Sequence, residues 1–82
     1  MLVTQLERRY GSRICRVDFF RKEKSLDDPD RNPYEWAQVS VYDTLYLRLP
    51  LMYSYVVDWA KAHKALNLFE RTGNCTKEAV FE

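Results

Sequence analysis

The chain has 82 residues, of which 46% are apolar and 30% are charged. This length is enough for one domain but too short for two, and the composition excludes an intrinsically disordered chain. The formal net charge of +1 is unevenly distributed, because residues 1–25 carry a local charge of +4 and the remainder carries −3. The basic N-terminal third is therefore a candidate contact for phosphate or for an acidic protein surface.

The distribution of apolar residues predicts a protein that stays out of the membrane. No segment approaches the roughly 20 apolar residues of a membrane span, and the first residues include no apolar run of signal-peptide length. We therefore expect a cytoplasmic protein with no membrane contact. In that compartment Cys15 and Cys75 are expected to be reduced thiols with structural roles.

Residues 2–10 predict a short helix. Val3, Leu6 and Tyr10 share one side at helical spacing, and Gly11 is a natural helix stop.

Residues 13–22 predict a strand, because apolar and polar residues alternate and Ile, Val and Phe are enriched. One face of this strand consists of Cys15, Val17 and Phe19. The other face carries Arg16, Asp18 and Phe20.

Residues 23–33 change to Ser, Asp, Pro and Asn, a composition typical of a polar loop. Asp28, Asp30 and Asn32 match the opening of a calcium-binding EF-hand loop. However, Pro33 occupies the position that requires Gly, and Val39 occupies the position of the bidentate Glu. We expect no metal site.

Residues 34–42 and 45–49 predict a hairpin. A three-residue loop places Val41 opposite Leu45, so that the aliphatic residues of both strands share one face. Thr44 is a poor residue for a left-handed turn position. The alternative for residues 44–49 is a short helix capped by Asp43 that ends before Pro50.

Residues 50–73 predict the longest helix. Pro50 suits the first turn, an apolar stripe at three-and-four spacing follows, and Gly73 ends the helix. The stripe consists of Met52, Val56, Trp59, His63, Leu66 and Phe69. Residues 74–82 are expected to be a C-terminal tail or a short strand.

The expected fold is a single α+β domain over residues 1–82. It has a three-stranded antiparallel sheet with a long C-terminal helix and a short N-terminal helix packed on one face. This α-β-β-β-α order resembles that of the double-stranded-RNA-binding fold. The family's Lys-Lys-x-x-Ala-Lys signature is missing, however, because the last helix begins Pro50-Leu51-Met52-Tyr53-Ser54, and its Gly-Pro-x-His loop is also missing.

The residues give little support to catalysis, and we expect a protein that is not an enzyme and carries no cofactor. The single histidine, His63, lies on the apolar stripe, whereas a general base needs a pocket and a positioned partner. Neither cysteine has a second histidine to activate it. Gly11 and Gly73 are isolated, so no phosphate-binding glycine loop can form.

The predicted outer face of the sheet is the candidate binding surface, because it combines aromatic residues with arginines. The candidate partner-binding residues are Arg16, Phe20, Trp36, Tyr42, Tyr46 and Arg48. The candidate basic patch consists of Arg8, Arg9, Arg13, Lys22 and Lys24. The alternative is that these aromatic residues pair across neighbouring strands and only stabilise the sheet.

We therefore expect a small non-enzymatic protein-binding module. Phage and mobile-element accessory proteins that inhibit a host protein or a defence complex are of this kind. The alternative is an RNA or single-stranded nucleic-acid binding domain that uses the same face and the basic N-terminal third. The small core is also compatible with a homo-oligomer.

Overall fold

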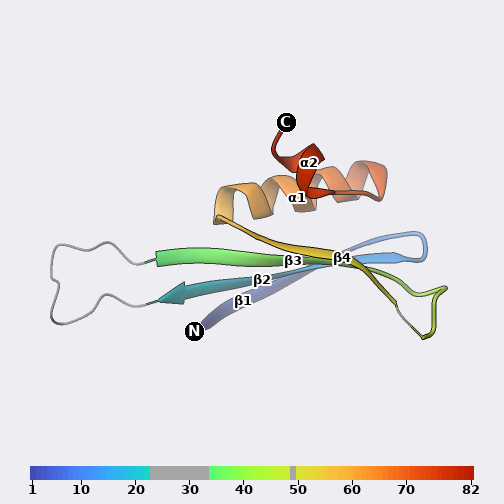
Figure 1. Cartoon of the computed structure of the whole chain (residues 1–82), viewed down its shortest axis with the longest axis horizontal. Helices are drawn as coiled ribbons and strands as arrows, with labels where there is room; N and C mark the ends of the chain where they lie inside the picture. Colours follow the sequence, from blue (N-terminus) through green and yellow to red (C-terminus); the bar gives the residue numbers. More distant parts are fainter. Residues whose placement is uncertain (23–33, 49) are drawn as a thin grey trace, which may run out of the picture.

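The computed structural model describes residues 1–22, 34–48 and 50–82. Four strands form one antiparallel sheet in the order β1-β2-β3-β4, and two helices follow them in the chain (Figure 1). The strands are β1 (Leu2–Tyr10), β2 (Arg13–Lys22), β3 (Tyr34–Asp43) and β4 (Leu51–Val57). The helices are α1 (Trp59–Thr72) and α2 (Lys77–Val80). The predicted α+β class, the antiparallel sheet and the C-terminal helix are confirmed.

The predicted N-terminal helix is wrong, because residues 2–10 form strand β1. β1 pairs with β2 through a hairpin in which Tyr10 lies opposite Arg13. The two loop residues are Gly11, with φ 60°, and Ser12. A two-residue hairpin loop with glycine at this position matches the twist of the strands, so the pair of long strands is favoured over a helix.

The β2–β3 pair supplies the centre of the core, as the alternation predicted. Cys15 lies opposite Val41, Val17 opposite Val39, and Phe19 opposite Ala37. All six side chains are buried on the face that the helices cover. The remaining core residues are Val57, Ala62, Ala65, Leu66, Phe69, Cys75 and Val80.

The third predicted strand and the start of the long helix are also wrong. Residues 45–48 belong to the connection between β3 and β4, and residues 51–57 form β4 instead of the first turns of a helix. Val41 pairs with Tyr53, not with Leu45. Tyr53, Tyr55 and Val57 have the strand period of two, and their aromatic or β-branched side chains suit a strand. The predicted strand-or-helix alternatives for residues 44–49 are therefore both replaced by a loop over the described residues 44–48.

Helix α1 begins after Asp58, whose carboxylate accepts a hydrogen bond from the backbone N–H of Lys61 at 2.8 Å. The side chain of Trp59 is half-buried, and its ring meets the Phe19 ring edge-on at 5.5 Å. Its indole N–H donates to the carbonyl oxygens of Phe20 and Trp36, at 3.1 and 3.0 Å. These bonds fix the first turn of α1 to two strands at once.

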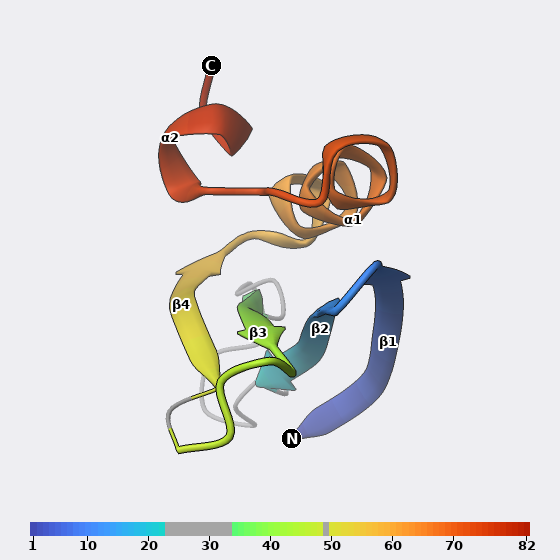
Figure 2. The same ribbon diagram turned by 90° about the vertical axis from the view of Figure 1, so that its right-hand side faces the viewer.

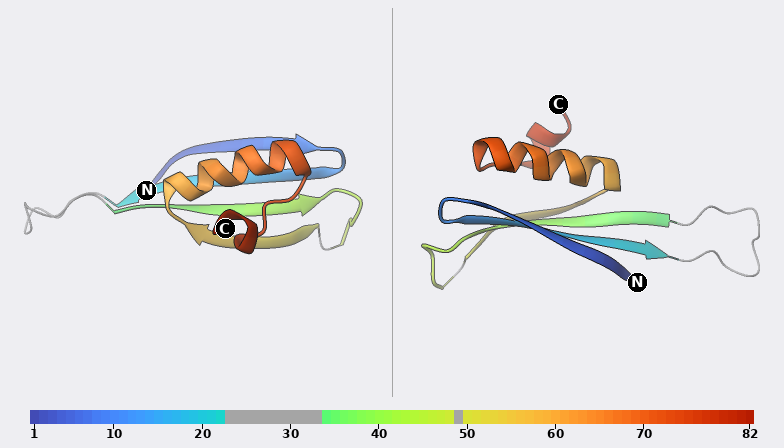
Figure 3. Two further views of the ribbon diagram at one scale, coloured as in Figure 1. Left: turned by 90° about the horizontal axis from the view of Figure 1, so that it is seen from above. Right: turned by 180° about the vertical axis from the view of Figure 1, so that it is seen from behind.

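Both helices lie on the same side of the sheet, as the end-on view in Figure 2 shows. Seen from above, α1 runs along the strands over the middle of the sheet, and α2 lies nearer β4 (Figure 3). Residues 77–80 thus form a short helix, where a tail or a strand was predicted. Among the residues that the structure describes, no helix lies on the other face of the sheet.

The element order β-β-β-β-α-α also removes the topological resemblance to the double-stranded-RNA-binding fold. The predicted polar loop 23–33, with Lys24 and the EF-hand-like Asp28, Asp30 and Asn32, lies outside the described residues.

Gly73 ends α1 as predicted, and we expect it to tolerate no side chain. Its φ is 76°, and a Cβ atom there would stand 2.5 Å from the Tyr10 ring. Gly11 has a similar φ of 60° but nothing within 4 Å of a Cβ position. Gly11→Ala should therefore lower the free energy of unfolding by about 1 kcal/mol through backbone strain. Gly73→Ala should cost a further 1–3 kcal/mol, roughly, for the clash.

Urea denaturation of both variants measures this difference. Equal losses of stability in the two variants would contradict the close packing of Tyr10 against the end of α1.

Candidate functional site

The uncovered face of the sheet, called here the outer face, is defined by the strand pairing. On β2 and β3 it holds the residues that alternate with the buried ones, and the register pairs Phe20 with Trp36 and Ile14 with Tyr42. Val56 and Ser54 extend it across β4, opposite Gln38 and Ser40. The members are Gln5, Glu7, Arg9, Ile14, Arg16, Asp18, Phe20, Lys22, Tyr34, Trp36, Gln38, Ser40, Tyr42, Ser54 and Val56.

Three rings form an aromatic stack at one end of the outer face. Trp36 stacks on Phe20 and on Tyr34, with ring centroids 5.3 Å apart in both pairs. Phe20 and Trp36 are half-buried, whereas Tyr34 is 63% exposed. The stack therefore has a structural role between β2 and β3, and it also presents an open ring to solvent.

The charges in the middle of the outer face are paired with one another. The Asp18 carboxylate accepts a hydrogen bond from the Gln5 side-chain amide at 2.7 Å and lies 3.5 Å from the Arg16 guanidinium. Asp18 and Ser40 are buried, although their strand positions point away from the helices. This centre is polar but electrostatically almost neutral.

The connection between β3 and β4, called here the β3–β4 loop (residues 44–50), is strongly apolar. Leu45, Tyr46 and Leu47 are 75%, 62% and 92% exposed. The same segment lines an open hollow of about 450 Å³ together with Arg48. Figures 1 and 2 show that the described part of this loop bends to the side of the sheet opposite the helices, so it borders the outer face.

Hydrogen bonds to Asp43 and Ser12 hold the start of this loop. The Asp43 carboxylate accepts from the Ser12 hydroxyl and from the backbone N–H of Leu45, both at 3.0 Å. The Thr44 N–H donates to the Ser12 carbonyl at 2.8 Å, and the Asp43 N–H donates to the Pro50 carbonyl at 2.7 Å. The apolar side chains are thus presented on a backbone that is tied to the β1–β2 turn.

The structure brings four of the six predicted partner-binding residues together on the outer face, namely Arg16, Phe20, Trp36 and Tyr42. Tyr46 and Arg48 lie instead in the β3–β4 loop, because residues 45–48 do not form a strand. Sequence reasoning missed Leu45, Leu47 and Val56 as exposed residues. The alternation of Leu45 and Leu47, and the place of Val56 on the predicted helix stripe, are both normally signals of burial.

The residues of the predicted basic patch do not share one surface. Arg8 pairs with Glu70 of α1 on the helix side. Arg13 donates to the Gly73 carbonyl at 3.2 Å and to the Asn74 side chain at 2.8 Å. Arg9 and Lys22 lie on the outer face, at positions far apart on β1 and β2.

The groups considered for catalysis or metal binding are placed as follows. His63 is exposed on α1, with its ring 5.0 Å from that of Phe19. Cys15 and Cys75 are both buried and both free. Within residues 1–22, 34–48 and 50–82, no three His, Cys, Asp or Glu side chains gather as metal ligands would. Over the same ranges, neither helix is long and apolar enough to span a bilayer.

Comparison with known proteins identifies no relative. No protein-family model matches the chain, and none of the curated proteins or solved structures matches it at a significant level.

The different settings of the aromatic residues predict different effects on stability. Trp36→Ala should lower the free energy of unfolding by about 1–2 kcal/mol, because it removes two stacking contacts of roughly 0.5–1.5 kcal/mol each. Tyr46→Ala should change it by less than about 0.5 kcal/mol, because the side chain is mostly exposed. Thermal or urea denaturation tests both values. A Trp36→Ala variant as stable as Tyr46→Ala would contradict the aromatic stack.

Proposed function

We propose that this chain is a non-enzymatic protein-binding module that docks through its outer face and the β3–β4 loop. The observation that carries the proposal is the amount of apolar surface on the side of the sheet without helices. Five large apolar side chains there and at its border are between 56% and 92% exposed. They are Tyr34, Leu45, Tyr46, Leu47 and Val56. Apolar exposure of this extent on a small domain is typical of an interaction surface.

The charge distribution favours a protein over a nucleic acid as the partner. On the outer face three basic residues, Arg9, Arg16 and Lys22, stand beside Glu7 and Asp18, and Arg16 is paired with Asp18. A nucleic-acid surface needs unpaired positive charge along the phosphate path. A core of aromatic and aliphatic side chains with a mixed polar rim is instead the usual anatomy of a protein interface.

The anchored loop supports the same proposal. Because Asp43 and Ser12 hold its backbone, the loop loses little conformational entropy when a partner orders its side chains. Leu47, which is 92% exposed, is suited to fill an apolar pocket on the partner. A surface that binds without chemistry of its own fits an inhibitor, such as a phage or mobile-element protein acting on a host complex, or a subunit of an assembly.

A second candidate is RNA or single-stranded DNA binding, which the open Tyr34 ring favours. Bases stack on exposed aromatic rings, and Lys22, directly opposite Tyr34, would meet the backbone phosphate. The two candidates differ in salt dependence, because phosphate contacts release counterions and an apolar protein interface does not.

The binding surface can be tested with a matched pair of added charges. Val56→Lys places a lysine at a 56% exposed position of the outer face. Asn67→Lys adds the same charge to an exposed position of α1, on the opposite side of the molecule. Tyr46→Ala truncates the loop. Partner recovery from nuclease-treated cell extract, followed by affinity measurement with the recovered partner, should show losses of about 1–3 kcal/mol for Val56→Lys and Tyr46→Ala. Asn67→Lys should bind like the wild type.

Three results would contradict the proposal. Equal losses of affinity in Val56→Lys and Asn67→Lys would exclude the outer face as the surface that contacts the partner. Loss of recovery after nuclease treatment, or a steep fall of affinity between low and physiological salt, would favour the nucleic-acid candidate.

A further inference from the structure

The only two cysteines of the chain meet in the core, although 60 positions separate them in the sequence. Cys15 comes from the middle of β2, and Cys75 from the segment between α1 and α2. Their sulfur atoms are 3.8 Å apart, within hydrogen-bonding distance, and neither side chain is exposed. Two thiols in contact are more than a pair of small apolar core residues, because they can be oxidised to a disulfide with little movement.

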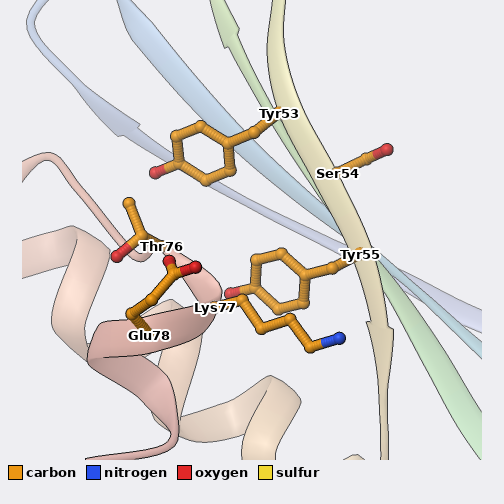
Figure 4. A pocket seen from close by; sticks show the side chains of 6 residues that line it. All are labelled: Tyr53, Ser54, Tyr55, Thr76, Lys77 and Glu78. Carbon is orange, nitrogen blue, oxygen red and sulfur yellow. The ribbon is translucent and has the colours of Figure 1, made fainter.

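A cavity opens at the edge of the sheet beside Thr76, the residue that follows Cys75. It has a volume of about 280 Å³ and is lined by Tyr53, Ser54, Tyr55, Thr76, Lys77 and Glu78. Figure 4 shows Tyr53 and Tyr55 pointing from β4 toward the segment that begins α2, while Ser54 points the other way. Their hydroxyls bind the backbone of Cys75: Tyr55 donates to its carbonyl at 2.5 Å, and Tyr53 accepts from its N–H at 2.9 Å.

The surroundings make Cys75 the more acidic of the two thiols. The thiol–thiol hydrogen bond lowers the pKa of Cys75 to about 7 against the opposing effect of burial, and the neighbouring Tyr55 and Tyr53 hydroxyls act in the same direction. The same thiol–thiol bond and burial raise the pKa of Cys15, which the positive charge of Arg8 lowers only in part. The directions of these shifts favour Cys75 as the thiolate nucleophile and Cys15 as the proton donor.

We propose that Cys15 and Cys75 form a redox-active dithiol site at which hydrogen peroxide produces an intramolecular disulfide. In the first step the Cys75 thiolate attacks one peroxide oxygen. The O–O bond breaks, Cys75 becomes a sulfenic acid, and hydroxide leaves. In the second step the Cys15 sulfur attacks the Cys75 sulfur, the S–O bond breaks, and the Cys15 proton leaves with the oxygen as water. The two thiols lose two electrons in total, and one peroxide gains them.

The resulting bond would connect β2 to the chain that follows α1. It closes a loop of 60 residues around β3, β4 and α1, so it would restrict the unfolded chain strongly. The melting temperature should rise by about 10 °C or more on oxidation.

The test is mild peroxide treatment of the reduced full-length protein, followed by intact-mass and peptide analysis. The expected product is a monomer that has lost two hydrogen atoms, carries a Cys15–Cys75 cross-link and melts at a higher temperature. The Cys15→Ser variant should stop at a Cys75 sulfenic acid that a sulfenic-acid probe such as dimedone traps. The Cys75→Ser variant should leave Cys15 unreacted.

The same treatment of the chain unfolded in guanidinium is the control for burial. The proposal is overturned if the native protein keeps both thiols under conditions that oxidise the unfolded chain. It is also overturned if the native cysteines form intermolecular bonds or sulfinic acids without the 15–75 link. Both results are read on the wild type, so they stand even if a cysteine variant fails to fold.

The tyrosines should act as positioning residues, and the pH profile of the reaction tests this role. The titratable groups that act on the pair are Tyr53 and Tyr55 of β4 and Arg8 of β1. Tyr55→Phe removes a hydroxyl that lowers the pKa of Cys75, so this pKa should rise and the midpoint of the rate profile should move to higher pH. Tyr10→Phe removes a hydroxyl from a 46% exposed side chain that is not among the groups acting on the pair, so it should leave the midpoint unchanged. An unshifted midpoint in Tyr55→Phe would contradict the assignment of Cys75 as the nucleophile.

Discussion

The physical constraint on which this structure depends is that a single helical layer covers only one face of a four-stranded sheet. The alternating side chains of β2 and β3 send Cys15, Val17 and Phe19 toward α1 and leave every second residue without a covering element. The outer face must therefore stabilise itself within its own layer. It does so through the stack of Phe20, Trp36 and Tyr34 and through the ion pair of Arg16 with Asp18. The stability of this face and its openness to solvent thus come from the same one-sided arrangement.

The sequence predicts the fold correctly where the apolar residues fit the strand period of two and do not fit the helical period of about 3.6. Residues 13–22 and 34–42 alternate over their whole length, and their faces were assigned correctly. Residues 2–10 and 51–57 fit both periods: Val3, Leu6 and Tyr10 have helical spacing, yet Leu6 and Tyr10 also share a strand face with Arg8. For such segments, only pairing with another strand decides between helix and strand. A local sequence pattern carries no information about that pairing. Two local signals did favour strands, the Gly11–Ser12 pair as a hairpin loop and the Tyr and Val content of β4.

The same reasoning explains how much of the candidate site could be predicted. The strand alternation of β2 and β3 is enough to place four of the predicted residues on one face, namely Arg16, Phe20, Trp36 and Tyr42. Tyr46 and Arg48 were assigned to that face through an alternation of leucines that looks like a strand. The loop forms because Asp43 and Thr44 bond with Ser12, more than 30 residues earlier in the chain. The cysteine pair was equally beyond prediction. Nothing in the sequence near Cys15 or Cys75 indicates that the segment after α1 returns to contact β2 and β4.

The two proposed sites lie on opposite sides of one strand, and this separates their effects. Cys15 points toward the helices, and its neighbour Arg16 points to the outer face. A disulfide from Cys15 to Cys75 would therefore hold the segment after α1 against the sheet without displacing the side chains that a partner would meet. Its main effect would fall on the unfolded and partly opened states, because the loop that it closes includes β3, β4 and α1. Peroxide would then lengthen the life of the binding-competent fold while leaving the affinity of the outer face unchanged.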